Sequence, residues 1–90
     1  MSGASTRWTN EAWADYLRWR EENRKVFERI NRLVQAVESD PFRGIGKPEP
    51  LRHELAGYWS RRITEEHRLV YKVTGKTAYI ISCRYHYSKK

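Results

Sequence analysis

Hydrophobic residues recur at helical spacing in the first half of the chain and at every second position in much of the second half. Over residues 10–22 apolar side chains return every three or four positions, and Thr9 or Asn10 is suited to be the N-cap. A second helix follows Asn23 and ends at Asp40-Pro41, because the residue before a proline disfavours helical backbone. Its apolar stripe consists of Val26, Ile30, Leu33, Val34 and Val37. These two consecutive amphipathic helices are expected to cover a common core.

After Gly57 the period changes to two, which is typical of strands. The predicted strands cover Tyr58–Ile63, His67–Val73 and Thr77–Arg84, with a further short strand over Ser5–Trp8. On the middle strand, Leu69, Tyr71 and Val73 are expected to face the helices, and Arg68, Val70 and Lys72 to form an exposed cationic face. The same alternation places Cys83 in the core, on one face with Tyr79 and Ile81.

The element order β-α-α-β-β-β predicts an α+β fold in which both N-terminal helices pack on one face of a small, twisted antiparallel sheet. The 90 residues contain no repeat or linker, so we expect a single domain over residues 1–90 with flexible ends at about 1–4 and 88–90. The segment from Pro41 to Pro50 holds two glycines and three prolines and is expected to be a shaped loop.

Composition narrows the possible functions. No apolar run approaches the roughly 18 residues of a membrane span, and the first residues lack the apolar centre of a signal peptide, so we expect a cytoplasmic protein without a membrane partner. A single cysteine excludes an internal disulfide. One cysteine and three histidines in the whole sequence also make a poor ligand set for a Cys/His zinc site. The sequence has no Gly-rich phosphate loop and no carboxylate cluster, so no cofactor or metal is expected.

The positive charge is concentrated in the second half of the chain. Residues 1–45 carry 8 Lys or Arg against 7 Asp or Glu, whereas residues 46–90 carry 10 against 4, and the formal net charge is +7. Such a one-sided field favours a polyanion such as nucleic acid, or an acidic partner protein. A solvated surface that only keeps the protein in solution is the alternative.

Three places in this half carry side chains suited to acid–base or phosphate chemistry. Glu49 lies between two prolines that restrict its backbone, although it could equally be an ordinary exposed glutamate. Arg62 and Arg68 flank a short turn, where two guanidiniums could reach one phosphate or could simply be surface arginines. His86 lies between tyrosines near the chain end, an unusual place for a core residue, although a frayed tail would also put it there.

Five segments together resemble the YoeB group of the RelE-like toxins, which belong to bacterial type II toxin–antitoxin modules. The resemblance spans about Trp8 to Tyr87. It is carried by Asp40-Pro41-Phe42, Gly46-Lys47-Pro48-Glu49-Pro50-Leu51, Gly57-Tyr58-Trp59-Ser60-Arg61-Arg62-Ile63-Thr64, Glu66-His67-Arg68-Leu69-Val70-Tyr71 and Cys83-Arg84-Tyr85-His86-Tyr87. The family's RelE-like fold, two helices on an antiparallel sheet, agrees with the predicted element order.

The resemblance implies a metal-independent endoribonuclease that cuts messenger RNA in the ribosomal A site and so inhibits translation. It implies that Glu49 is the general base, that Arg68 stabilises the transition state and that His86 is the general acid. It also implies RNA or phosphate binding by Arg62, Tyr87, Arg52 and Lys47. Relatives commonly stop at the position of Tyr87, whereas this chain continues with Ser88-Lys89-Lys90, so no role is assigned to a terminal carboxylate.

The implied partners are a YefM-type antitoxin, the 70S ribosome with mRNA in its 30S A site, and operator DNA reached only through the antitoxin complex. A homodimer is a further expectation. Two other functions stay open at the level of sequence: a non-catalytic binding protein, either a topoisomerase inhibitor or an antitoxin-dependent co-repressor, and an inactive paralogue. Neither needs an acid–base pair, so the set of Glu49, Arg68 and His86 favours the enzyme.

Overall fold

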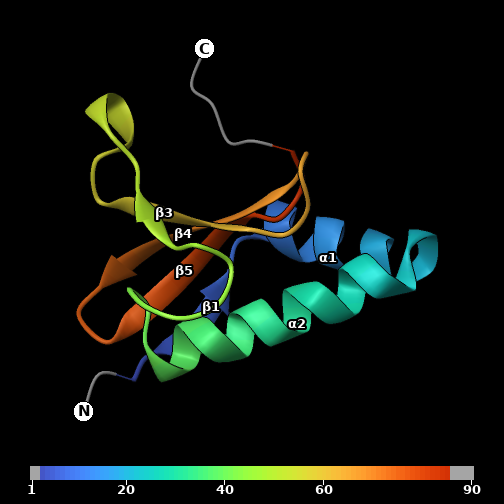
Figure 1. The fold of residues 1–90 in the computed structure, drawn as a ribbon, viewed down its shortest axis with the longest axis horizontal. Helices are drawn as coiled ribbons and strands as arrows, with labels where there is room; N and C mark the ends of the chain where they lie inside the picture. Colours follow the sequence, from blue (N-terminus) through green and yellow to red (C-terminus); the bar gives the residue numbers. More distant parts are fainter. Residues whose placement is uncertain (1–2, 86–90) are drawn as a thin grey trace.

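Two helices cover one face of a five-stranded sheet in the computed structural model, which describes residues 3–85 (Figure 1). The elements in chain order are β1 (Ser5–Trp8), α1 (Asn10–Glu22), α2 (Arg24–Ser39), β2 (Glu49–Pro50), the short 3-10 helix η1 (His53–Leu55), β3 (Tyr58–Arg62), β4 (Arg68–Thr74) and β5 (Thr77–Ser82). The strands lie side by side in the order β1-β5-β4-β3-β2. The predicted fold class is confirmed.

The helix boundaries follow from two caps. The Thr9 hydroxyl accepts a hydrogen bond from the Ala12 amide at 3.1 Å and begins α1. Asn23 ends α1, because its amide donates a hydrogen bond to the Trp19 carbonyl. It also begins α2, because its side-chain Oδ1 accepts a hydrogen bond from the Val26 amide at 3.2 Å. One residue therefore caps both helices, and the predicted start of the second helix after Asn23 is confirmed.

The core lies between α2 and the central strands. The predicted apolar stripe of α2 is confirmed: Ile30, Leu33 and Val37 are fully buried, Val26 is nearly so, and Val34 packs at the margin. From the sheet the buried partners are Leu69, Tyr71, Ala78 and Ile80, joined by Ala12 and Trp19 from α1. The helices thus cover one face of the sheet and leave the other uncovered.

The sheet has two features beyond the predicted element order. β1 runs parallel to β5, while the other neighbouring strands pair antiparallel, so the sheet is mixed at one edge. The residues of β2 pair with β3, Glu49 opposite Ser60 and Pro50 opposite Trp59, which adds an edge strand inside the predicted loop. Two residues that include a proline carry no alternation, which is why the hydrophobic pattern did not predict β2.

Strict alternation fails at one place on β5. Tyr71 pairs with Ile80 but Val70 pairs with Ser82, so β5 holds one extra residue there. A bulge of this kind shifts the faces of the residues that follow it. The prediction that Cys83 is buried is confirmed, but its expected alignment with Tyr79 was wrong, because Ala78 and Ile80 are the buried residues before the bulge.

The middle strand follows its predicted faces with one exception. Leu69 and Tyr71 are buried against the helices and Lys72 is exposed, as expected. Val70 was expected on the exposed cationic face but is only 1% exposed. It lies at the bulge, opposite Ser60 and Ser82, where the regular register of β4 and β5 is interrupted.

Candidate active site

The pairing of three strands brings a carboxylate and two guanidiniums to the open face of the sheet. Arg62 on β3 lies directly opposite Arg68 on β4, and Glu49 on β2 lies opposite Ser60, two residues before Arg62. Since alternate residues share a face, all three side chains belong to the face that the helices leave uncovered. Diagonal neighbours in a sheet are about 7–8 Å apart, within reach of one bound phosphodiester.

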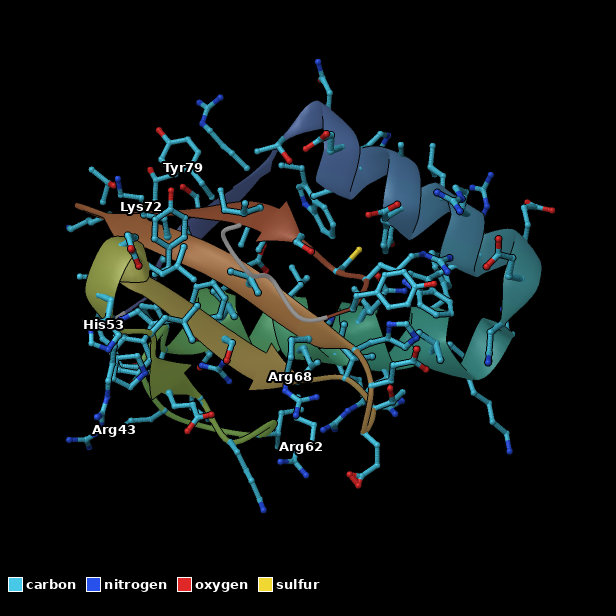
Figure 2. All side chains as sticks on the ribbon, turned by 90° about the horizontal axis from the view of Figure 1, so that it is seen from above. Arg43, His53, Arg62, Arg68, Lys72 and Tyr79 are labelled. Atoms are coloured by element: carbon cyan, nitrogen blue, oxygen red, sulfur yellow. The ribbon has the colours of Figure 1, made fainter. Side chains whose placement is uncertain are left out.

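Arg68 is held firmly, whereas Arg62 projects into solvent. The Arg68 Nη1 donates to the carbonyls of Thr64, Glu65 and His67 at 2.8, 3.1 and 3.1 Å. No carboxylate among residues 3–85 forms an ion pair with Arg62 or Arg68. Figure 2 shows the two side chains extending from the same margin of the sheet. Two adjacent cations without a protein anion make a favourable place for a phosphate.

Glu49 is exposed, and its backbone is fixed by β2 and by the prolines on both sides. Lys47 and Arg52, the two further predicted phosphate-binding residues, are also exposed and lie two and three residues from Glu49 along the chain. Lys47 has a φ of 51°, so the loop turns sharply just before the strand that carries Glu49. The predicted cations thus flank the predicted base.

His86 and Tyr87 lie outside the described residues, which end at Tyr85. The Tyr85 amide donates to the His67 Nδ1 at 2.7 Å, and the Tyr85 carbonyl accepts from the Arg68 amide at 3.1 Å. The described chain therefore ends at the start of β4, beside one of the two site arginines and one residue before His86.

Arg61, which the sequence placed only by its parity, supports the loop that leads to Glu49. Its side chain is fully buried and donates to the carbonyls of Asp40, Arg43 and Ile45 at 2.7–3.0 Å and to the Tyr71 hydroxyl at 3.0 Å. The Tyr71 hydroxyl donates in turn to the Pro41 carbonyl at 2.7 Å, closing the network. Burial raises the pKa of Tyr71 above its usual value, although the bond from Arg61 acts in the opposite direction.

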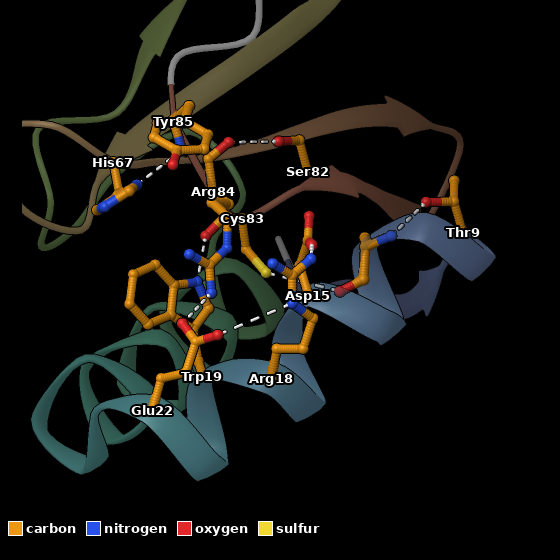
Figure 3. A network of polar contacts seen from close by, with 11 residues as sticks. Thr9, Asp15, Arg18, Trp19, Glu22, His67, Ser82, Cys83, Arg84 and Tyr85 are labelled. Atoms are coloured by element: carbon orange, nitrogen blue, oxygen red, sulfur yellow. Dashed lines mark hydrogen bonds and ion pairs between the residues drawn. The ribbon is translucent and has the colours of Figure 1, made fainter.

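The sequence analysis also missed the contacts of Trp19 and Arg84, which join α1 to the end of the chain. The Arg84 guanidinium lies over the Trp19 ring and pairs with Glu22 (Figure 3). These residues are 65 positions apart, so no local pattern could have paired them.

The described residues include no group of three or more His, Cys, Asp or Glu side chains placed to hold a metal ion. In the same part of the chain, neither helix has the length and apolar character needed to cross a membrane.

Comparison with known proteins identifies the family of the chain. Residues 8–87 match the model of the YoeB-like toxins of bacterial type II toxin–antitoxin systems. The chain belongs to this toxin family. A YoeB toxin of Escherichia coli K12 is 55% identical over 80 residues, which cover 89% of this chain and 95% of that protein. The resemblance inferred from the sequence is thereby confirmed.

Solved structures of family members share the fold. The YoeB/ParE toxin from Agrobacterium tumefaciens superposes with a TM-score of 0.86 at 46% identity, covering 92% of this chain and 99% of that one. The YoeB of Staphylococcus aureus, solved as a dimer and in a heterotetrameric complex with YefM, gives a TM-score of 0.84 at 40% identity, covering 93% and 98%.

Proposed function

We propose that this family member is a ribosome-dependent endoribonuclease that cleaves mRNA in the ribosomal A site and thereby stops translation. The proposal rests chiefly on one observation: Arg62 and Arg68 lie opposite each other on the open sheet face that also carries Glu49. A protein that only binds its partners has no need of a carboxylate beside two anion-binding cations.

The chemistry uses the nucleophile that RNA already carries. Glu49 accepts the proton of a ribose 2′-hydroxyl, and the 2′-oxygen attacks the neighbouring phosphorus. The bond from phosphorus to the 5′-oxygen breaks, and His86 donates a proton to that oxygen as it leaves. The products are a 2′,3′-cyclic phosphate and a 5′-hydroxyl, so no water, metal or redox partner enters the step.

The two arginines stabilise the charge that grows on the phosphoryl oxygens. Arg68 suits this role because its guanidinium is already fixed by three carbonyls and needs little reorganisation. Arg62 supplies a second cation, while Lys47 and Arg52 bind the flanking phosphates and Tyr87 holds the substrate. A glutamate with an ordinary pKa of about 4.3 is a weak base for a hydroxyl, so the rate depends on positioning.

The partners follow from the family. A YefM-type antitoxin holds the toxin inactive, and the free toxin acts in the cytoplasm on the 70S ribosome. Operator DNA is reached only through the antitoxin complex. The cationic face suits an acidic antitoxin segment that folds on binding. A homodimer is proposed by analogy with the dimer of the S. aureus relative.

The test measures single-turnover cleavage of ribosome-bound mRNA by purified toxin. Glu49→Gln, Arg68→Ala and His86→Gln are each expected to lower the rate, by about 10²–10⁴-fold for the two proton-transfer residues. Glu54→Gln, the same change at an exposed glutamate of η1, is the matched control and should cut at the parent rate. A 2′-deoxy nucleotide at the scissile position should abolish cleavage.

Two results would overturn the proposal. One is cleavage of the 2′-deoxy substrate, which has no internal nucleophile. The other is parent activity in all three variants, which would return the protein to the class of binding modules.

A further inference from the structure

The end of the described chain is fastened to α1 by a cluster that we call the C-terminal clamp, formed by Trp19, Glu22, His67 and Arg84. Trp19 and Glu22 are three residues apart on α1 and share one face of the helix. The Trp19 ring is buried, with 5% exposed, and its Nε1 donates to the Cys83 carbonyl at 2.9 Å. The first residue after β5 is thus tied to the helix.

Arg84 is held on both sides. Its guanidinium carbon lies 4.0 Å from the centroid of the Trp19 ring, and its Nη2 lies 2.7 Å from the Glu22 Oε1 (Figure 3). The Arg84 side chain is only 13% exposed, so water screens these interactions less than it screens a surface pair. The hydrogen bond from Arg84 holds the pKa of Glu22 below its usual value.

The third member of the clamp fixes the next residue. The His67 ring lies edge-on to Trp19, with 4.8 Å between ring centroids, and its Nδ1 accepts the Tyr85 amide. The Arg68 amide donates to the Tyr85 carbonyl. The amide and the carbonyl of Tyr85 are therefore both hydrogen-bonded, so the orientation of its backbone is fixed.

Tyr85 also has a φ of 60°, in the left-handed region that residues other than glycine seldom adopt. Such a conformation is unfavourable for an ordinary residue and persists only when its surroundings impose it. Stability alone does not call for a strained residue near the end of a chain. The strain turns the chain at the position just before His86.

We infer that Arg84, held between Trp19 and Glu22, is a positioning residue: by fixing the backbone of residues 83–85 it supports the proton transfer that the proposed function assigns to His86. The inference rests on the proposed function. Arg84 itself touches no reacting atom in this assignment. It acts only through the chain that follows it.

The experiment is a double-mutant cycle on single-turnover cleavage of ribosome-bound mRNA. Arg84→Ala should lower the rate about 10- to 100-fold in the parent, as a misplaced catalytic group does, and less than about 2-fold further in His86→Gln. Arg84→Lys keeps the charge but loses the flat group that stacks on the ring, so it should recover only part of the rate.

Arg18→Ala is the matched control, because Arg18 lies on the same helix 3.9 Å from Glu22 but is 60% exposed, and among the described residues it forms ion pairs with Asp15 and Glu22 and none with residues 83–85. It should cut at the parent rate. A second readout is hydrogen exchange at the Tyr85 amide, which should quicken in Arg84→Ala and stay unchanged in Arg18→Ala. If Arg84→Ala unfolds, Glu22→Gln breaks the ion pair with little change of shape and should give the same two effects.

Parent activity in folded Arg84→Ala overturns the inference, and so does an equal loss in both backgrounds, since Arg84 would then act independently of His86. The inference is also overturned if the rate of hydrogen exchange at the Tyr85 amide is unchanged in both Arg84→Ala and Glu22→Gln. Failure of the proposed function looks different: His86→Gln itself would cut at the parent rate.

Discussion

Arg61 and Arg62 are neighbours in the sequence and lie on opposite faces of β3. Arg62 reaches solvent beside Arg68, whereas Arg61 is buried with four hydrogen bonds and no carboxylate. A buried charge is tolerated only when its donors are satisfied, and the loop carbonyls of Asp40, Arg43 and Ile45 satisfy them. The same residue type therefore supports the fold at one position and is available to substrate at the next.

Arg61→Ala should lower the free energy of unfolding by roughly 3–5 kcal/mol, because three carbonyls and the Tyr71 hydroxyl lose their partner. Arg62→Ala, the adjacent surface change, should alter it by less than about 0.5 kcal/mol while lowering cleavage. Urea titrations followed by circular dichroism measure the first quantity. Equal stability losses in the two variants would contradict these roles.

Cys83 is buried, and this burial, with a smaller contribution from Asp15, raises the pKa of its thiol to about 12. Since the thiolate is the reactive form, the folded protein at pH 8 holds only about one thiolate in ten thousand. A thiol reagent should therefore modify Cys83 at a rate set by unfolding, and promptly in 8 M urea. Rapid modification of the native protein would show that the chain end opens readily.

At the scale of elements, the sequence predicted most of the fold and part of the site. The caps at Thr9 and Asn23 and the stripe of α2 were readable because each depends on residues a few positions apart. The position of Arg62 across from Arg68 followed from the short turn between their two predicted strands. These features depend on residues close together in the sequence, so the spacing of those residues was enough to predict them.

The features that the sequence did not predict depend on contacts between distant segments. β1 lies beside β5 although the strands are about seventy residues apart, and nothing in either strand specifies a parallel neighbour. The bulge at Ile81 changes parity without a glycine to mark it. The C-terminal clamp joins α1 to residues 83–85 in the same long-range way, so Trp19 was read only as part of a helix.

The loop from α2 to β2 depends on Gly46, whose φ is 87° and whose carbonyl accepts the Arg62 amide. A Cβ there would lie 2.6 Å from the Leu33 Cδ2 and 3.1 Å from the Arg61 Cβ. Gly46→Ala should therefore combine backbone strain with overpacking, lowering the unfolding free energy by about 2–4 kcal/mol.

Gly75→Ala is the matched control, since Gly75 has a φ of 59° and nothing within 4 Å of the added carbon. It should lower the unfolding free energy by only about 1 kcal/mol, measured in the same thermal or urea melts. If the two variants melt together, the close approach at Gly46 is relieved at no cost and the loop is less tightly packed than described.

At the scale of the whole molecule, the helical side and the open face of the sheet differ in net charge. The two helices carry six acidic and six basic residues, so their charges balance, while the open sheet face presents Arg62, Arg68 and Lys72 (Figure 2). With a formal net charge of +7, long-range attraction draws a polyanion toward the sheet rather than the helices.

Binding to a short single-stranded RNA should therefore weaken as salt rises, with log K falling by about 0.7 per phosphate contact for each unit of log salt. Arg62→Ala should reduce this slope by about one contact. Arg24→Ala, an exposed arginine of α2 paired with Glu28, should leave the slope unchanged. Fluorescence anisotropy across a salt series gives both slopes, and a larger effect of Arg24 would place the RNA on the helices.

The last strand of residues 3–85, β5, lies inside the sheet, between β1 and β4. During synthesis β1 and the two helices emerge early but have no strand to join until β5 has been made. Every earlier fragment lacks both the strand that joins β1 to β4 and the residues that the clamp holds. If the proposed cleavage activity needs the complete sheet, it can appear only after synthesis has passed β5, when the ribosome has made nearly the whole chain.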